Sequence, residues 1–170
     1  LAIIGVLRAN RNKTHLIVGA TEHHSVLALA HSLEKDGYSL TILPCDSSGC
    51  YDPDDLRKQI RPETALVSLQ IANNETGVLQ PIEAIVTITR ALRIPLHCDA
   101  VAAYGHIPLD TRASKIDLLS ASAHKMGGPR GAGFLFIRNE IPINPLFSGG
   151  SQERSLRPGT ENLPAIAGFA

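Results

Sequence analysis

Four short polar segments of this 170-residue chain contain side chains that can handle protons, bind anions and react with carbonyl compounds. They are Thr21-Glu22-His23, Asn73-Asn74-Glu75, Asp99 and Ser122-Ala123-His124-Lys125. A lysine amine attacks carbonyl groups when it is partly desolvated or lies near other positive charge. A carboxylate can keep an aromatic nitrogen protonated, and hydroxyl and N–H groups bind phosphate. The set therefore predicts a site for an aromatic, phosphorylated carbonyl cofactor.

Pyridoxal phosphate is the cofactor whose chemistry requires these side-chain types. Lys125 could bind it covalently, and Asp99 could pair with the ring nitrogen so that the ring accepts electrons from the substrate. Asn74 could bond the phenolic oxygen of the ring, and the flat imidazole of His23 could stack on the ring. Three features could hold the phosphate, namely Ser122, His124 and the glycine-rich segment 127–133.

Each of these residues also has a purely structural interpretation when it is taken singly. An aspartate after a strand is commonly a helix cap, and a histidine there can cap or flank the next helix. Paired asparagines form turns, and a lone lysine is ordinarily a solvated surface residue. Only their joint occurrence after successive strands favours the functional interpretation.

The elements that must position these residues follow from the hydrophobic pattern. From residue 15 onward, short β-branched or leucine-rich runs alternate with longer amphipathic stretches, which is typical of an α/β fold with a mainly parallel sheet covered by helices on both faces. The pattern predicts strands at residues 15–20, 39–43, 64–72, 94–98, 116–122 and 133–137. It predicts helices at 24–35, after Asp52-Pro53, at 81–92 and at 163–170. Because ligands bind at the carboxyl ends of such strands, we expect the four polar segments at one edge of the sheet.

Five motifs resemble those of the class V aminotransferase group of fold-type I pyridoxal-phosphate enzymes. The motifs are Thr21-Glu-His23, Ala72-Asn-Asn-Glu-Thr-Gly77, His97-Cys-Asp-Ala100, Ser122-Ala-His-Lys125 and Arg157-Pro-Gly-Thr-Glu-Asn162. Within that group they look most like cysteine desulfurases of the NifS/IscS kind and the related selenocysteine lyases. The resemblance implies that residues 1–170 are part of the cofactor-binding large domain, with an N-terminal phosphate loop and a C-terminal small domain outside these residues.

The resemblance also implies roles for seven residues and a reaction. Lys125 would hold pyridoxal 5'-phosphate covalently, Asp99 would pair with the ring nitrogen, and His23 would stack on the ring and take part in proton transfer. Further cofactor contacts would come from Asn74, Ser122, His124 and Thr160, the last reaching the phosphate of the neighbouring subunit in a homodimer. The implied reaction removes sulfur from L-cysteine to give L-alanine and a persulfide on an enzyme cysteine, for transfer to an acceptor protein as in iron-sulfur cluster assembly.

Two features depart from the family pattern. Ala102 stands where the family usually has a glutamine three residues after the aspartate, so one cofactor hydrogen bond is missing. None of Cys45, Cys50 and Cys98 occupies the place of the sulfur-accepting cysteine, and we expect Cys98 to be a small core residue. We expect the nucleophilic cysteine, and the arginine that receives the substrate carboxylate, beyond residue 170.

Charge balance, the length of apolar runs and cysteine spacing argue against several other classes of protein. The 16 basic and 16 acidic residues cancel and form no long run of one sign, which argues against nucleic acid or an anionic membrane as a partner. Apolar runs such as residues 1–7 are far shorter than the roughly 18 to 20 residues that cross a bilayer. The three cysteines form no CxxC pair, which argues against a disulfide framework and a zinc knuckle. We therefore expect a protein of the cytoplasm or of an organellar matrix.

The same residues leave four alternatives to a cysteine desulfurase. A selenocysteine lyase acting on L-selenocysteine fits segments 146–154 and 157–162 equally well. A non-catalytic domain with the same fold is favoured by Ala102. A nucleotide-binding domain is disfavoured because no GxGxxG follows the first strand and no GxxxxGK[ST] occurs. A metal site at His97 and Cys98 is disfavoured because neighbours on a strand point to opposite faces.

Overall fold

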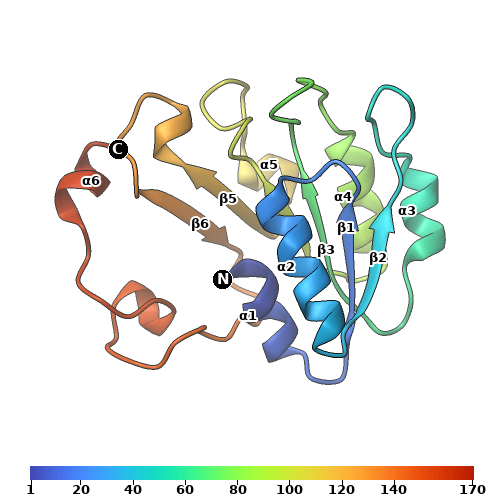
Figure 1. Ribbon diagram of the computed structural model, residues 1–170, viewed down its shortest axis with the longest axis horizontal. Coiled ribbons are helices and arrows are strands. Elements are labelled where there is room, and N and C mark those ends of the chain that lie inside the picture. The colour runs from blue at the N-terminus through green and yellow to red at the C-terminus, as the bar shows by residue number, and fades with distance from the viewer.

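The computed structural model describes residues 1–170 and is built around a six-stranded sheet (Figure 1). The strands are β1 (His15–Gly19), β2 (Ser39–Leu43), β3 (Thr64–Gln70), β4 (Leu96–Asp99), β5 (Leu118–Ser122) and β6 (Gly133–Ile137), in the order β2-β1-β3-β4-β5-β6. All neighbouring pairs are parallel except β5 and β6, which are antiparallel. The predicted α/β fold with a mainly parallel sheet is confirmed.

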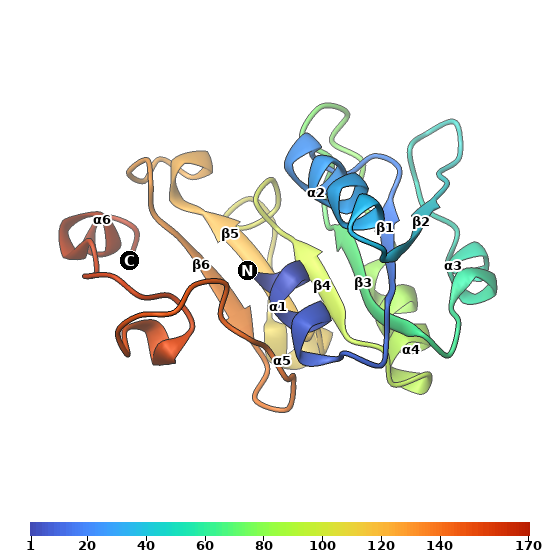
Figure 2. The same cartoon turned by 60° about the horizontal axis from the view of Figure 1, so that its bottom comes forward.

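Helices cover both faces of this sheet (Figures 1 and 2). The α-helices are α1 (Ala2–Ala9), α2 (His24–Lys35), α3 (Pro53–Gln59), α4 (Ile82–Ala91), α5 (Thr111–Ser114) and α6 (Leu163–Ala167), and the short 3-10 helices are η1 (Ala123–Lys125) and η2 (Glu153–Ser155). Helices α1 and α2 lie on one face, and α3 and α4 lie on the other. No helix combines the length and hydrophobicity that a membrane crossing requires.

The core consists of two hydrophobic clusters, one on each face of the sheet. Val6 of α1 and Ala30 of α2 pack with Leu66 in one cluster, whereas Leu56 of α3 and Ile85 of α4 belong to the other. All seven residues of β3 are buried. A central parallel strand is covered on both faces, so even its polar residues Thr64, Ser68 and Gln70 are enclosed.

Local signals explain where most elements begin and end. The Asp52 carboxylate accepts a hydrogen bond from the N–H of Asp54, and Pro53 occupies the first turn of α3. Gly37 follows α2 with φ +94°, a backbone conformation in which glycine has no steric penalty. The predicted bounds of α2, β2 and β6 are confirmed.

The structure changes the bounds of six predicted elements and adds two α-helices, α1 and α5, for which no element was predicted. Strand β4 begins at Leu96 rather than at residue 94, because Arg93 has φ +55° and Pro95 has no N–H to donate to a neighbouring strand. Strand β1 ends at residue 19, β3 at residue 70 and β4 at residue 99, while β5 begins at residue 118. Helix α4 spans residues 82–91, and α6 ends at residue 167. Residues 2–9, for which no element was predicted, form α1, whose buried Ile3, Val6 and Leu7 have helical spacing.

Candidate active site

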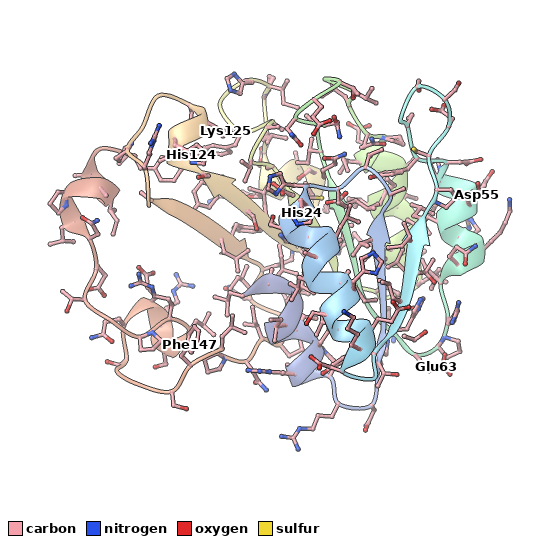
Figure 3. The ribbon with its side chains drawn as sticks, in the orientation of Figure 1. His24, Asp55, Glu63, His124, Lys125 and Phe147 are labelled. Carbon is pink, nitrogen blue, oxygen red and sulfur yellow. The ribbon has the colours of Figure 1, made fainter.

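Six of the seven predicted site residues lie at the ends of four neighbouring parallel strands, and Thr160 is the exception. Thr21, Glu22 and His23 follow β1, Asn73 and Asn74 follow β3, Asp99 ends β4, and Lys125 ends η1 directly after β5. Figure 3 shows His124 and Lys125 at the same edge of the sheet as His24, the first residue of α2. Glu63, which precedes β3, lies at the opposite edge. The structure thus brings these segments to the one edge where ligands of such sheets bind.

The face of the sheet under α1 and α2 becomes polar near this edge. On β4, Leu96 and Cys98 belong to the cluster on the α4 side, so His97 and Asp99 lie on the other face. In the strand registers, Asp99 pairs with Gln70 of β3 and with Ser120 of β5. Residues that pair across parallel strands share a face, so three adjacent strands place polar side chains side by side where the cofactor is expected.

Asp99 is a partly buried carboxylate with spare hydrogen-bonding capacity. Its Oδ1 accepts a hydrogen bond from the N–H of Val101 at 2.9 Å, and its Oδ2 has no partner in the chain. Burial raises the pKa of Asp99, while the Val101 N–H and the nearby His23 oppose that rise. No helix begins at Asp99, so the helix cap that the structural interpretation offered is absent, and one carboxylate oxygen stays free for a ligand.

His23 caps helix α2 and holds its ring in one tautomer. Its Nδ1 accepts a hydrogen bond from the N–H of Ser25 at 3.2 Å and lies 2.7 Å from the Ser25 hydroxyl. Since a backbone N–H can only donate, Nδ1 carries no proton, and a neutral ring has its proton on Nε2. The ring is exposed, so Nε2 is available to a ligand at the sheet edge.

Lys125 presents a free amine on a short rigid element. Its side chain is exposed and forms no salt bridge, while its carbonyl accepts a hydrogen bond from Nε2 of His106 at 3.0 Å. Directly before it, the Ser122 hydroxyl lies 2.7 Å from Nδ1 of His124. The N–H of Gly128 bonds the Ala123 carbonyl at 2.9 Å, which fastens the glycine-rich turn onto η1. An added Cβ at Gly128 would lie 3.0 Å from the Ala123 methyl, so this close approach favours glycine.

The two adjacent asparagines have different roles. The Asn73 amide donates to the Thr21 carbonyl at 2.9 Å, and its Oδ1 accepts from the N–H groups of Glu75 and Thr76. Asn73 thus fastens the loop after β3 to the turn after β1. Asn74 is exposed and forms no hydrogen bond within the chain, so its amide is free for a ligand.

Thr160 and Ala102 stand apart from this group. Thr160 is exposed in the segment between η2 and α6 and forms no hydrogen bond to the other predicted site residues. Its contact with a neighbouring subunit stays a prediction. Ala102 is partly buried and packs against the cluster on the α4 side, where its methyl group supplies no donor to a cofactor.

Sequence reasoning missed a buried network that supports the turn carrying His23. The Gln70 amide donates to the Thr21 carbonyl at 2.7 Å, and the Gln70 N–H donates to Glu22 Oε1 at 2.6 Å. The Tyr51 hydroxyl lies 2.7 Å from the Thr21 hydroxyl and donates to Glu22 Oε1 at 3.3 Å. The only signal in the sequence was a glutamine in an otherwise largely apolar strand, because the partners lie 29 to 49 residues apart.

His97 is a second buried polar group, and its hydrogen bonds could not be predicted from the sequence. Its Nδ1 lies 2.8 Å from the Ser68 hydroxyl and its Nε2 lies 2.7 Å from the Ser120 hydroxyl. Both ring nitrogens are therefore engaged by neighbouring strands. Burial lowers the pKa of His97 to about 4, so the ring is neutral at physiological pH.

The fold and the site define a class of protein. Residues 1–170 match the family model described as aminotransferase class-V, and the chain belongs to this pyridoxal-phosphate-using family. The donor set fits that cofactor because it combines an amine with no acidic partner, a carboxylate with one free oxygen, and a neighbouring hydroxyl and imidazole. These groups are Lys125, Asp99, Ser122 and His124.

Individual relatives narrow the comparison within the family. The chain is 48% identical over 169 residues to cysteine desulfurase IscS of Methanosarcina thermophila, covering 99% of this chain and 42% of the relative. It is 45% identical over 172 residues to the mitochondrial cysteine desulfurase of Candida maltosa, covering 99% of this chain and 36% of that protein.

Two solved structures agree with these sequence matches. A NifS-like protein superimposes with a TM-score of 0.95 at 37% identity, covering 99% of this chain and 47% of that one. A structure described as SspA in complex with cysteine superimposes with a TM-score of 0.94 at 37% identity, covering 99% of this chain and 49% of that one. The chain therefore spans less than half the length of these relatives.

Proposed function

We propose that the protein containing this chain is a pyridoxal-phosphate-dependent cysteine desulfurase, which converts L-cysteine to L-alanine and leaves the sulfur as a persulfide on an enzyme cysteine. The observation that carries the proposal is the placement of two groups at one sheet edge. The unpaired amine of Lys125 follows β5, and the carboxylate of Asp99 ends the adjacent strand β4 with one oxygen free. The identity to cysteine desulfurases and the likeness to a structure with bound cysteine support this choice of substrate.

Some residues of the chain would bind the cofactor, and others would hold or transfer a proton. Lys125 would hold the cofactor covalently, and the free oxygen of Asp99 would accept a hydrogen bond from the ring nitrogen and keep it protonated. Bound pyridoxal phosphate would supply an electron sink for the negative charge that develops on the substrate. Ser122 and His124 would bind the phosphate, and Asn74 would bond the ring oxygen.

His23 would stack on the cofactor ring and transfer the substrate proton. Because its Nδ1 is committed to Ser25, the imidazole can turn little without losing the helix cap. Its exposed Nε2 would therefore meet the substrate in a constant orientation, which is the condition for efficient proton transfer.

The sulfur-accepting cysteine is not one of the three cysteines of this chain in our proposal. Cys98 is fully buried in the core, where burial raises the pKa of its thiol. Cys45 and Cys50 follow β2, which is separated from β4 by β1 and β3. We therefore place the nucleophile in another part of the full-length protein.

We further propose that the protein works as a homodimer in which Thr160 reaches the phosphate of the neighbouring subunit. The C-terminal part of the chain exposes large apolar side chains, among them Phe147, which Figure 3 labels. Phe147 is 71% exposed and Leu163 is 69% exposed. We propose that a second copy of the protein covers these apolar side chains. The mitochondrial relative and the IscS relatives are compatible with the expected location in an organellar matrix or the cytoplasm.

Covalent labelling tests the assignment of Lys125. The full-length protein is loaded with pyridoxal phosphate, reduced with borohydride and digested, and the labelled peptide is identified by mass spectrometry. We expect the label on Lys125, its loss in Lys125→Ala, and its retention in Lys35→Ala, a control at an exposed lysine at the end of α2. A label on a different lysine would refute the site.

Substrate comparison tests the reaction. We expect alanine and persulfide from L-cysteine, measured on the loaded full-length protein. Turnover of L-selenocysteine without turnover of L-cysteine would favour a selenocysteine lyase instead. Absence of any label and any turnover in a folded protein would favour a non-catalytic domain.

A further inference from the structure

Glu22 is a buried carboxyl group in the turn that carries the candidate catalytic histidine. It lies between Thr21 and His23 and is 5% exposed. Its Oε1 accepts hydrogen bonds from the N–H of Gln70 at 2.6 Å and from the hydroxyl of Tyr51 at 3.3 Å. Its Oε2 is buried and has no hydrogen-bond partner. One oxygen is thus held by two donors, and the other meets none.

This asymmetry favours the neutral acid over the carboxylate. A buried carboxylate oxygen without a donor loses its hydration and gains no hydrogen bond in return, which strongly disfavours the charged form. A proton on Oε2 removes the charge and leaves both hydrogen bonds to Oε1 intact. The proton of neutral Glu22 therefore lies on Oε2, the oxygen without a hydrogen-bond partner.

The groups that face Glu22 supply no cation to stabilise a charge. The Gln70 N–H bonds Glu22 from β3, and the Tyr51 hydroxyl bonds it from the loop before α3. From β4, the Asp99 carboxylate and the Cys98 thiol, which lie on opposite faces of that strand, interact with Glu22 only through their charges. On its own turn it is flanked by Thr21 and by His23, whose ring caps α2. Burial raises the pKa of Glu22 to about 8, and the negative charge of Asp99 raises it as well. The hydrogen bonds from Gln70 and Tyr51 act in the opposite direction and lower this pKa.

We propose that Glu22 is a positioning residue that stays protonated while the site works, so that Asp99 carries the only negative charge of the buried pair. The inference deepens the proposed function and rests on it. Two neighbouring carboxyl groups in unequal environments separate into one acid and one carboxylate. The neutral Glu22 ties the turn of His23 to β3 and leaves the charge on Asp99, where the ring nitrogen needs it.

Loss of the Glu22 proton would place a second negative charge beside Asp99 in a buried region. The turn would have to open to hydrate that charge, and His23 would move with it. We therefore expect the site to lose function above about pH 8 because of Glu22. Glu22→Gln keeps a carbonyl oxygen for both hydrogen bonds and has no proton to lose.

Infrared spectroscopy tests the protonation state directly. The cofactor-free full-length protein, with ¹³C-labelled glutamate, is titrated from pH 6 to pH 10, and the band of protonated carboxyl groups is followed. Glu22 is the only buried glutamate of these 170 residues. We expect a glutamic acid band at pH 7 that disappears with a midpoint near pH 8, is absent in Glu22→Gln, and persists in Glu83→Gln, a control at an exposed residue of α4. A band at pH 7 that Glu22→Gln leaves unchanged, or no band at all, would overturn the proposal.

The pH profile of the loaded enzyme separates positioning from a merely structural role. We expect Glu22→Gln to keep kcat/KM at pH 7 within about twofold of the wild type and to exceed it about tenfold at pH 9, where only about one wild-type site in ten keeps the Glu22 proton. Identical high-pH limbs in both proteins would contradict the proposal. Failure to bind pyridoxal phosphate would overturn the proposed function, while the infrared titration would still decide the state of Glu22.

Discussion

The buried imidazole of His97 should make the stability of the protein depend on pH in a way that can be calculated. His97 is 4% exposed and lies on β4 two residues before Asp99, bonded on either side to Ser68 and Ser120. In the unfolded chain the ring takes up a proton below its ordinary pKa of about 6.5. In the folded protein burial lowers that pKa to about 4. Between these two values protons bind only the unfolded state, so stability is lost as the pH falls from 6.5 towards 4.

The size of this loss follows from the separation of the two pKa values. Each unit corresponds to about 1.4 kcal/mol, so His97 should reduce the free energy of unfolding by about 2 kcal/mol at pH 5 and by about 3 kcal/mol at pH 4. His97→Gln removes the titrating group. The substitution disturbs the hydrogen bonds to Ser68 and Ser120 and should cost about 1–3 kcal/mol at pH 7.5. That cost should shrink by about 2 kcal/mol at pH 5, because only the wild type is penalised by acid.

Urea unfolding of the cofactor-free full-length protein at pH 7.5 and pH 5 measures the difference. His24→Gln serves as the control, because His24 is exposed at the start of α2 (Figure 3) and its side chain forms no buried hydrogen bond. A cost of His97→Gln that is the same at both pH values would refute the reasoning. It would show that the ring accepts a proton in the folded state as readily as in the unfolded chain.

Three further substitutions test the site and its support. Lys125→Ala should abolish covalent attachment of pyridoxal phosphate without loss of folding, since the side chain is exposed, and attachment in this variant, seen by mass spectrometry, would contradict its role. Asp99→Asn should retain the attachment but lower kcat on the order of a hundredfold or more, because the ring nitrogen loses its protonating partner, and unchanged turnover would remove Asp99 from the mechanism. Gly19→Ala should destabilise the protein by about 1–3 kcal/mol in urea unfolding, because the new Cβ would lie 2.0 Å from the Tyr51 hydroxyl, and an unchanged midpoint would show that Tyr51 is free to move.

Much of the fold could be predicted because local signals encode it. Helix α2 begins at the residue after the capping His23 and is followed by Gly37 with its positive φ, and both features can be recognised in the sequence. The start of β4 could not be predicted from hydrophobicity, because Ile94 still bonds the Thr89 carbonyl of the preceding helix. Helix α1 was missed because an apolar run of seven residues has no unique period without a surface to pack against.

Part of the candidate site could likewise be predicted from the sequence, and part could not. The positions of Asp99 and Lys125 directly after strands are visible in the sequence, and parallel strands bring their carboxyl ends to one edge. The network of Glu22, Gln70 and Tyr51 carries no comparable signal. Its members are far apart in the chain, and nothing in their local sequence indicates that they meet.

The sequence by itself determined the alternation of strands and helices, the residue types that follow each strand, and hence the chemistry available at the edge of the sheet. Only the tertiary structure decided which strands are neighbours, that β6 runs antiparallel, and that Glu22 and His97 are enclosed. The physical reason is that periodicity and capping act over a few residues, whereas burial and nearby charge, which set the protonation of a carboxyl or an imidazole, come from residues distant in the chain.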